Sequence, residues 1–267
     1  MKVIKLYLFG PTQIWIKGQS ISQFRSHKIR DLLIYLTVNA NQPQQRNGLA
    51  ALLWSDYPDQ VARTNLRNTL AQLRKLLAPV LADTPDFLRS TRHIIQINFD
   101  SQAHYCDVHQ VEAALATYQT HRHENRLLCL ACLEGLTQSV AHYQAEFLSS
   151  LGQKDSSLFA DWLLEKQEYY HRHNLRACNA VAEHYFASGD YGQAETYLRR
   201  QLSLEPWLEQ VHHRLIHTLA LSGQRGAALA QYERCQQILA QELGVEPGPA
   251  TTTCTSKFGA VVCQNWG

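Results

Sequence analysis

The chain has 267 residues, of which 45% are hydrophobic and 18% are charged, and it contains no low-complexity block. This length and composition fit two ordinary globular domains and exclude a disordered or fibrous protein. The net charge of +2 conceals an asymmetry. Residues 1–98 hold 13 Lys and Arg against 5 Asp and no Glu, a balance of +8, whereas residues 99–267 have a balance of −6. Because a carboxylate beside a phosphate weakens binding to a polyanion, this basic, glutamate-free segment indicates a nucleic-acid partner.

The N-terminal stretch "MKVIKLYLFGPTQIWIKG" is interrupted by Lys5, Gly10, Pro11 and Lys17, and no signal-peptide cleavage pattern follows it. No run of about 18 apolar residues occurs, so we expect no transmembrane helix and no membrane partner. The seven cysteines are an odd number scattered through helical patterns, which is typical of reduced thiols. These features predict a cytoplasmic protein.

The first predicted elements are two short strands, "KVIKLYLFG" and "TQIWIKG", joined by a Gly-Pro turn. Helices follow in "SHKIRDLLIYLTVNA", with Ser26 as the N-cap, and in "RNGLAALLW". A third helix is predicted over residues 59–77, and "FLRSTRHIIQIN" is predicted to form two strands around a basic turn. A sheet, three helices and a hairpin in this order outline a winged helix-turn-helix.

The third predicted helix separates its apolar side chains from its polar side chains. Leu66, Leu70, Leu73 and Leu77 fall on one narrow stripe at about 100° per residue. The arginines fall directly beside this stripe, the other polar side chains follow them around the helix, and no acid occurs between Asp59 and Asp83. A solvated face normally mixes acids with bases, whereas groove recognition needs Arg, Lys, Asn and Thr. We therefore predict DNA contacts from this helix through Arg63, Thr64, Arg67, Asn68, Arg74 and Lys75.

The predicted hairpin adds a second basic element. Arg89, Arg92 and His93 lie at its turn, where a wing would reach the adjacent minor groove or its phosphates. Lys28, near the start of the first helix, is a further candidate for a phosphate contact. Surface solubility is the alternative role for His93 and Lys28.

A possible metal site occurs in "HRHENRLLCLAC", where Cys129 and Cys132 have CxxC spacing downstream of His121 and His123. Zinc sites usually hold such a pair in a turn. Here the surrounding "NRLLCLACLEGL" has a leucine-rich helical pattern, in which residues three apart share a buried face. We therefore interpret the cysteines as packing residues and predict no metal ligands.

The last part of the chain repeats. The segments "SGDYGQAETYLRRQLSLEP" and "SGQRGAALAQYERCQQILA" align with Gly189 over Gly223 and Ala194 over Ala228, an offset of 34 residues. This is the tetratricopeptide period, and Pro206 stands where such repeats place a proline. Stacked helix pairs of this kind bind other proteins.

No catalytic motif is found. The nucleotide-binding, metalloprotease and serine-hydrolase patterns G-x-x-x-x-G-K-[ST], G-x-G-x-x-G, H-E-x-x-H and G-x-S-x-G are all missing from the sequence. We expect no catalytic residues, no cofactor and no enzymatic activity.

The segments "ALLWSDYPDQVARTNLRNTLAQLRKLL" and "LSLEPWLEQVHHRLIHTLALSGQRGAALAQYERCQQILAQELGVEPGPAT" closely resemble the Streptomyces antibiotic regulatory protein type of transcriptional activators. The resemblance covers roughly residues 3–252. It implies an OmpR-like DNA-binding domain that reads direct repeats near promoters, followed by a bacterial transcriptional activator domain that helps position RNA polymerase. A homodimer on DNA is an assembly that repeated sites allow. The wing departs from the family in lacking a glycine, and "TCTSKFGAVVCQNWG" departs from it after Thr252.

The predicted fold is mainly α, with a winged helix-turn-helix (α+β) followed by an all-α tetratricopeptide-like domain. The domains are residues 1–98, residues 99–253 and an atypical tail, 254–267. The predicted function is that of a transcriptional activator bound to double-stranded DNA. The alternative is a helical-repeat scaffold whose basic domain binds RNA or a protein partner.

Overall fold

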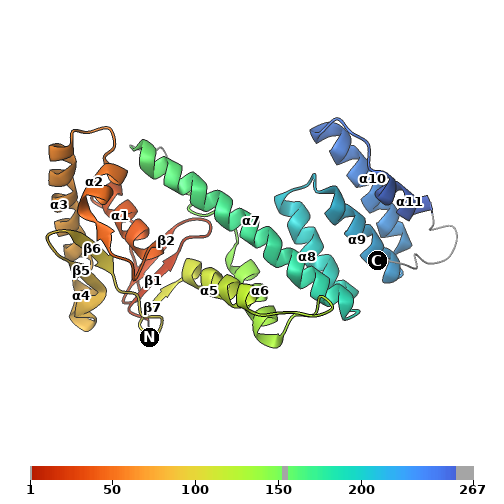
Figure 1. Ribbon diagram of the computed structural model, residues 1–267, viewed down its shortest axis with the longest axis horizontal. Coiled ribbons are helices and arrows are strands. Elements are labelled where there is room, and N and C mark those ends of the chain that lie inside the picture. The colour runs from red at the N-terminus through yellow and green to blue at the C-terminus, as the bar shows by residue number, and fades with distance from the viewer. Residues whose placement is uncertain (1, 152–155, 257–267) are drawn as a thin grey trace. The chain divides into compact units, whose positions relative to one another are not determined.

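The computed structural model describes residues 2–151 and 156–256, which fold into two compact units. The N-terminal unit combines Met1–Ala113 with Ala141–His171, and the helical unit combines Ala114–Val140 with Arg172–Gly267. Helices predominate in both units, with a small amount of sheet near the N-terminus (Figure 1), which confirms the predicted fold class. Of the predicted tail, residues 257–267 lie outside the described residues.

A four-stranded sheet opens the N-terminal unit. Strands β1 (Ile4–Tyr7) and β2 (Gln13–Ile16), the two that the sequence predicts, pair antiparallel. Two further strands were not predicted: β3 (Gln19–Ser20) pairs antiparallel with β2, and β7 (His104–Cys106) pairs in parallel with β1. The prediction that the chain is helical beyond residue 99 is therefore wrong at β7. Three residues are too short to show a strand period, and β7 forms because it completes the edge of β1.

Four helices and a second sheet follow. Helix α1 (His27–Val38) begins after Ser26, whose hydroxyl accepts a hydrogen bond from the Lys28 N–H, so the predicted N-cap is confirmed. Helices α2 (Arg46–Leu53), α3 (Asp59–Leu76) and α4 (Ala78–Asp83) lead through a 3-10 turn, η1 (Pro85–Phe87), to β5 (Leu88–Ser90) and β6 (Ile94–Ile97). Strand β4 (Gln44–Gln45) pairs with β6 and makes this sheet three-stranded. The arrangement is the predicted winged helix-turn-helix.

An aromatic cluster ties a distant segment into the N-terminal unit. Phe9, two residues after β1, contacts the rings of Tyr143, Phe147 and Tyr170, at 5.2, 6.1 and 5.3 Å between centroids. Tyr170 belongs to the long helix α7 (Ser157–Ala187). The domain boundary after residue 98 stays a prediction about independent folding. The compact unit that contains this cluster extends beyond that boundary, because it also includes residues 99–113 and 141–171.

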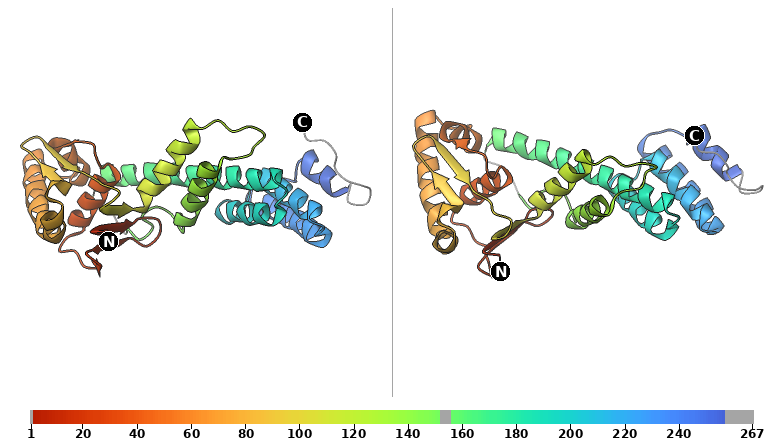
Figure 2. Two further views of the ribbon diagram at one scale, coloured as in Figure 1. Left: turned by 90° about the horizontal axis from the view of Figure 1, so that it is seen from below. Right: turned by 60° about the horizontal axis from the view of Figure 1, so that its bottom comes forward.

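The helical unit is built from parts of α5 (Asp107–Thr120), α6 (Leu130–His142) and α7, together with α8 (Tyr191–Leu204), α9 (Glu209–Leu221), α10 (Arg225–Glu242) and α11 (Pro249–Ser256). Helix α9 packs against α8, α10 and α11, and the views in Figure 2 show the adjacent helices α8 to α10. Their shared core consists of Ala182, Leu198, Val211, Leu215, Ile216, Leu219 and Ala228. No helix among residues 2–151 and 156–256 is both long and apolar enough to cross a bilayer.

The 34-residue repeat appears as two matching helix ends. Gly189 and Gly223 both adopt left-handed backbone, with φ of 82° and 80°. After each glycine the next N–H donates to a carbonyl five residues earlier, from Asp190 to Tyr185 and from Gln224 to Leu219. This is the bonding pattern of a Schellman cap, which favours glycine because it has no Cβ. The aligned residues Ala194 and Ala228 are fully buried, as expected, and the tetratricopeptide assignment stays a prediction.

Enlarging either alanine is expected to disrupt this packing. Ala194→Leu and Ala228→Leu should each lower the free energy of unfolding by about 1 to 3 kcal/mol, because extra methylenes in a filled core force neighbouring side chains from their rotamers. Thermal melting of both variants measures the effect. The matched control is Ala230→Leu, an exposed position on the same helix α10. Equal melting of all three variants would contradict the repeat alignment.

The CxxC segment differs from its predicted conformation. Helix α6 begins at Leu130, so Cys129 precedes the helix and is exposed, while Cys132 lies in the first turn and is buried. The interpretation of both cysteines as sharing the buried face of one helix is therefore wrong. The leucine-rich pattern suggested that the helix begins before Cys129, because leucines usually mark a buried helical face. Leu127 and Leu130 are in fact both exposed, so they do not mark such a face.

Candidate nucleic-acid interface

Helix α3 separates its side chains into two faces. Ala62, Leu66, Thr69, Leu70 and Leu73 are buried, and Leu77, which follows the helix, is buried as well. The predicted leucine stripe is therefore confirmed. All six predicted contact residues on this helix are exposed: Arg63, Thr64, Arg67, Asn68, Arg74 and Lys75. The 3.6-residue period of the apolar positions produces this separation, since it aligns them along the side that packs on the unit.

The exposed face of α3 is almost free of competing interactions. Arg63 forms an ion pair with Asp59 at 3.6 Å, but the two side chains are 59% and 92% exposed, so the pair contributes little. The Thr64 hydroxyl donates to the Gln60 carbonyl at 3.0 Å. Thr64 therefore offers a partner its methyl group and an acceptor lone pair, but its donor is already used within the helix.

The wing hairpin, β5 and β6 with the turn Thr91–His93, has an ordered turn without glycine. The Thr91 hydroxyl accepts hydrogen bonds from the N–H groups of His93 and Ile94, both at 3.2 Å, and the Thr91 N–H donates to the Ile94 carbonyl at 2.9 Å. A threonine side chain thus stabilises a turn that contains no glycine. Arg89, Arg92 and His93 are all exposed on this hairpin, as predicted.

Arg46, which the sequence reasoning did not select, fastens the wing hairpin to the start of α2. Its N–H donates to the His93 carbonyl at 2.9 Å, its Nε to the Thr91 carbonyl at 2.8 Å, and its Nη2 to the Ser90 hydroxyl at 2.7 Å. Burial lowers the pKa of the Arg46 guanidinium, and the charge of Arg74 adds to this effect. The only sequence signal was an arginine at the start of a helix, which is too common to single it out.

Lys28 stands on a different element from the other candidates. It lies half-buried in the first turn of α1, rather than on α3 or the wing hairpin. The structure thus brings the predicted residues of α3 onto one exposed face and those of the hairpin onto one turn, and leaves Lys28 as a separate candidate.

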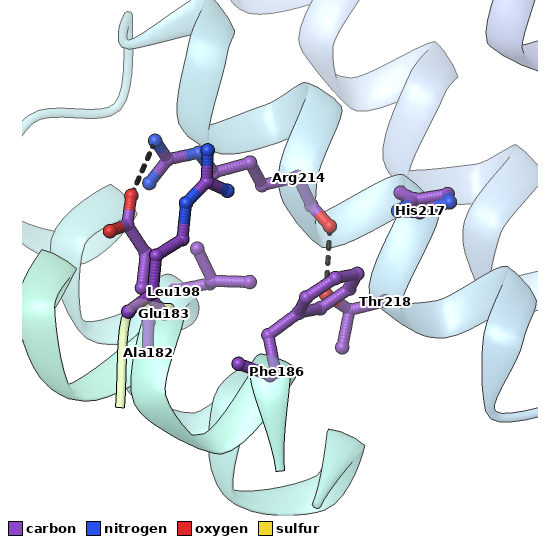
Figure 3. A pocket seen from close by; sticks show the side chains of 9 residues that line it. Ala182, Glu183, Phe186, Leu198, Arg214, His217 and Thr218 are labelled. Atoms are coloured by element: carbon purple, nitrogen blue, oxygen red, sulfur yellow. Dashed lines mark hydrogen bonds and ion pairs between the residues drawn. The ribbon is translucent and has the colours of Figure 1, made fainter. Parts of the chain in front are cut away.

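A second candidate site is a pocket of about 230 Å³ in the helical unit, between α7, α8 and α9. Figure 3 shows Phe186 and Leu198 beside the ion pair of Arg214 and Glu183, which measures 2.9 Å. Thr218 donates to the Arg214 carbonyl at 2.8 Å. The described lining residues include no Ser, Cys or Lys that could act as a nucleophile beside a base.

Comparisons with known proteins place these features in a family. Residues 106–257, more than half of the chain, match the model of the family described as Bacterial transcriptional activator domain. The solved structure titled "Mycobacterium tuberculosis EmbR in complex with low affinity phosphopeptide" has a TM-score of 0.67 at 22% identity, covering 96% of this chain and 65% of that one. That structure shows the likeness of the fold.

Three curated relatives match nearly the whole chain. The transcriptional regulatory protein EmbR of Mycobacterium tuberculosis is 26% identical over 255 residues, which cover 91% of this chain and 60% of that protein. The transcriptional regulatory protein MoaR1 of the same species is 22% identical, covering 92% and 76%, and the regulatory protein AfsR of Streptomyces griseus is 22% identical, covering 92% and 23%. The chain thus spans 60% of the length of the EmbR proteins it matches.

All of these relatives are named as regulators and none as an enzyme, in agreement with the expected lack of enzymatic activity. The resemblance drawn from the sequence segments is confirmed by the family match. This chain belongs to the bacterial transcriptional activator domain family.

Proposed function

We propose that this chain is a sequence-specific activator of transcription that binds double-stranded DNA through α3 and the wing hairpin. The observation that carries the proposal is the exposed face of α3, which has four basic side chains and one asparagine and no acid after its first residue. Acid-free basic faces lower the free energy of binding to phosphates through counterion release. Family membership supports the same reading.

The proposed roles follow from side-chain chemistry. Arg67 and Asn68 read base edges in the major groove, since guanidinium and amide groups form paired hydrogen bonds with guanine and adenine. Arg63, Arg74 and Lys75 contact phosphates, and Thr64 contacts a phosphate or a thymine methyl. On the wing hairpin, Arg89, Arg92 and His93 enter the minor groove or contact its phosphates, and Lys28 adds a phosphate contact.

The wider arrangement is also part of the proposal. Direct repeats near promoters would be read by successive copies of the N-terminal unit, and a homodimer on DNA is one way to achieve this. The helical unit would contact RNA polymerase, because stacked helix pairs present protein-binding surfaces. Footprinting on promoter DNA, followed by transcription with purified polymerase, separates these steps.

The central test is a pair of substitutions on α3. Arg67→Ala should weaken specific binding by about 1 to 3 kcal/mol and relax the preference at one base position. Lys75→Ala should weaken all sequences about equally and lower the salt slope by roughly one unit. The measurement is a binding titration at several salt concentrations, on duplexes selected from a random library and on scrambled versions of them.

Arg234→Ala, an exposed arginine on α10, is the matched control and should leave binding unchanged. If Arg67→Ala weakened selected and scrambled duplexes equally, Arg67 would be a phosphate anchor. If neither α3 substitution changed binding, the DNA-reading role would be withdrawn. Stronger binding to single-stranded RNA than to any selected duplex would favour the alternative, a helical-repeat scaffold with a basic RNA-binding domain.

A further inference from the structure

Four side chains with metal-binding chemistry converge in the helical unit. His121 follows the end of α5, His123 lies in the next loop, and Cys129 and Cys132 flank the start of α6. One ligand atom from each residue lies within 4.8 Å of the others. Nδ1 of His121 is 3.3 Å from Sγ of Cys129 and 3.3 Å from Sγ of Cys132.

These distances fit one small ion. In a tetrahedral site with Zn–S near 2.3 Å and Zn–N near 2.0 Å, sulfur and nitrogen ligands are roughly 3.5 Å apart. The CxxC pair also has the required conformation, because Cys129 lies in the loop and Cys132 in the first helical turn, so the pair straddles a turn as in zinc sites. The helix start that contradicted the packing interpretation is therefore what makes the pair suitable for a metal.

The loop between the two histidines and the two cysteines makes a tight reversal and is hydrogen-bonded to α7. Asn125 and Arg126 adopt left-handed backbone, with φ of 53° and 63°, and reverse the chain between the histidines and the cysteines. The Leu128 N–H donates to Nδ1 of His184 on α7 at 3.0 Å. Asparagine tolerates this backbone region, but arginine does so at a cost. A loop held in this shape brings its ligands together before an ion arrives.

Ordinary packing does not account for the cluster. Cys129 is exposed, so its thiol is not buried among apolar groups. The ring of His123 stacks on Tyr118 at 5.5 Å, and its Nε2 is buried with no hydrogen-bond partner among the described residues. A buried polar atom without a partner is unfavourable, and most such groups have one. A metal ion bound at Nε2 would supply the missing partner.

We propose that His121, His123, Cys129 and Cys132 bind one Zn²⁺ ion in a closed tetrahedral site that joins α5 to α6. Two imidazole nitrogens and two thiolates form the N₂S₂ set that favours zinc over magnesium or calcium. Binding releases the thiol protons to solvent, and four protein ligands leave no position for a substrate. The site is thus structural, and it stabilises the helical unit independently of DNA binding.

The test measures metal in the full chain, purified with a non-thiol reductant and desalted. Elemental analysis should find one zinc per chain. Replacing it with Co²⁺ should produce the absorption bands of tetrahedral cobalt with thiolate ligands. Loss of an outer-shell partner of a metal ligand typically costs about 10- to 100-fold in affinity. Loss of a direct ligand in Cys129→Ser or His123→Gln should therefore weaken zinc binding at least about 100-fold.

Two controls isolate the cluster. Cys235→Ala, a cysteine on α10, and His93→Gln, an exposed histidine on the wing hairpin, should retain one zinc per chain. A chelator should lower the melting temperature of the wild-type chain and leave that of Cys129→Ser unchanged. Because Cys129 is exposed and outside the helix, its substitution leaves the core intact.

Three results would overturn the site. The first is a reduced wild-type chain that retains no zinc and shows no cobalt–thiolate absorption. The second is zinc binding by Cys129→Ser and His123→Gln as tight as in the wild type, which would place the ion elsewhere. The third is a Cys129–Cys132 disulfide that persists under reductant and excludes metal, which would make the CxxC pair an oxidised cross-link.

Discussion

Replacing Phe147 with alanine is expected to lower the free energy of unfolding of the N-terminal unit by about 3 to 5 kcal/mol, the usual range for removing a buried phenyl ring. Phe147 is fully buried and contacts the rings of Phe9, Trp162 and Tyr170. Its removal leaves a cavity among rings that are too rigid to collapse into it. Denaturant unfolding followed by tryptophan fluorescence measures the loss.

The control for this experiment is Tyr57→Ala, an aromatic residue that is 50% exposed. It should change the free energy of unfolding by less than about 1 kcal/mol, because little apolar area returns to water. A loss at Phe147 as small as this would mean that residues 141–171 are not integral to the unit. The predicted boundary after residue 98 would then describe the folding unit well.

Asp107→Ala is expected to destabilise the same unit by at least about 3 kcal/mol, because it leaves three N–H donors without an acceptor. The carboxylate accepts hydrogen bonds from the N–H groups of Leu8, Phe9 and Val108, at 2.7, 3.1 and 2.8 Å. Alanine leaves these donors without an acceptor, and each orphaned buried donor costs about 1 to 3 kcal/mol. Thermal and denaturant melts measure the change. Asp161→Ala, an exposed aspartate on α7, should melt like the wild type.

The same carboxyl group makes stability depend on pH. Burial raises the pKa of Asp107 to about 6, against the lowering effect of its backbone hydrogen bonds. An acid whose pKa is higher in the folded chain than in the unfolded chain favours folding when protonated. The stability of the wild type relative to Asp107→Asn should therefore fall as pH rises from about 4 to about 6. An unchanged difference across this range would contradict the raised pKa.

The features that sequence reasoning predicted correctly are those set by local periodicity. The apolar residues of α1 and α3 follow the helical period, so their buried faces and the N-cap at Ser26 could be read directly. The hairpin was marked by alternation around a polar turn. The alignment of Gly189 with Gly223 pointed to equivalent positions, and both follow a helix and adopt left-handed backbone.

The features that were missed depend on residues far apart in the sequence. Strand β7 pairs with the edge of β1, and residues 141–171 join the N-terminal unit through contacts such as Phe9 with Phe147 and the hydrogen bond from the Leu148 N–H to the Leu8 carbonyl. The contacts of Arg46 with the wing hairpin span about 45 residues. A pattern within a short window carries no information on such pairings, and the metal-ligand cluster was obscured for a related reason, since its helix start depends on how the loop folds.

The three hydrogen bonds from Arg46 reduce the conformational entropy that the wing hairpin would lose on binding a partner. A wing that moved freely in the unbound protein would lose backbone and side-chain freedom when it entered a groove, and this loss would oppose binding. Here Arg46 and the Thr91 hydroxyl already hold the turn in one conformation. The hairpin is therefore preorganised, because most of its ordering occurs during folding. In the proposed DNA complex, a contact from Arg89 or Arg92 would contribute more of its interaction free energy to affinity.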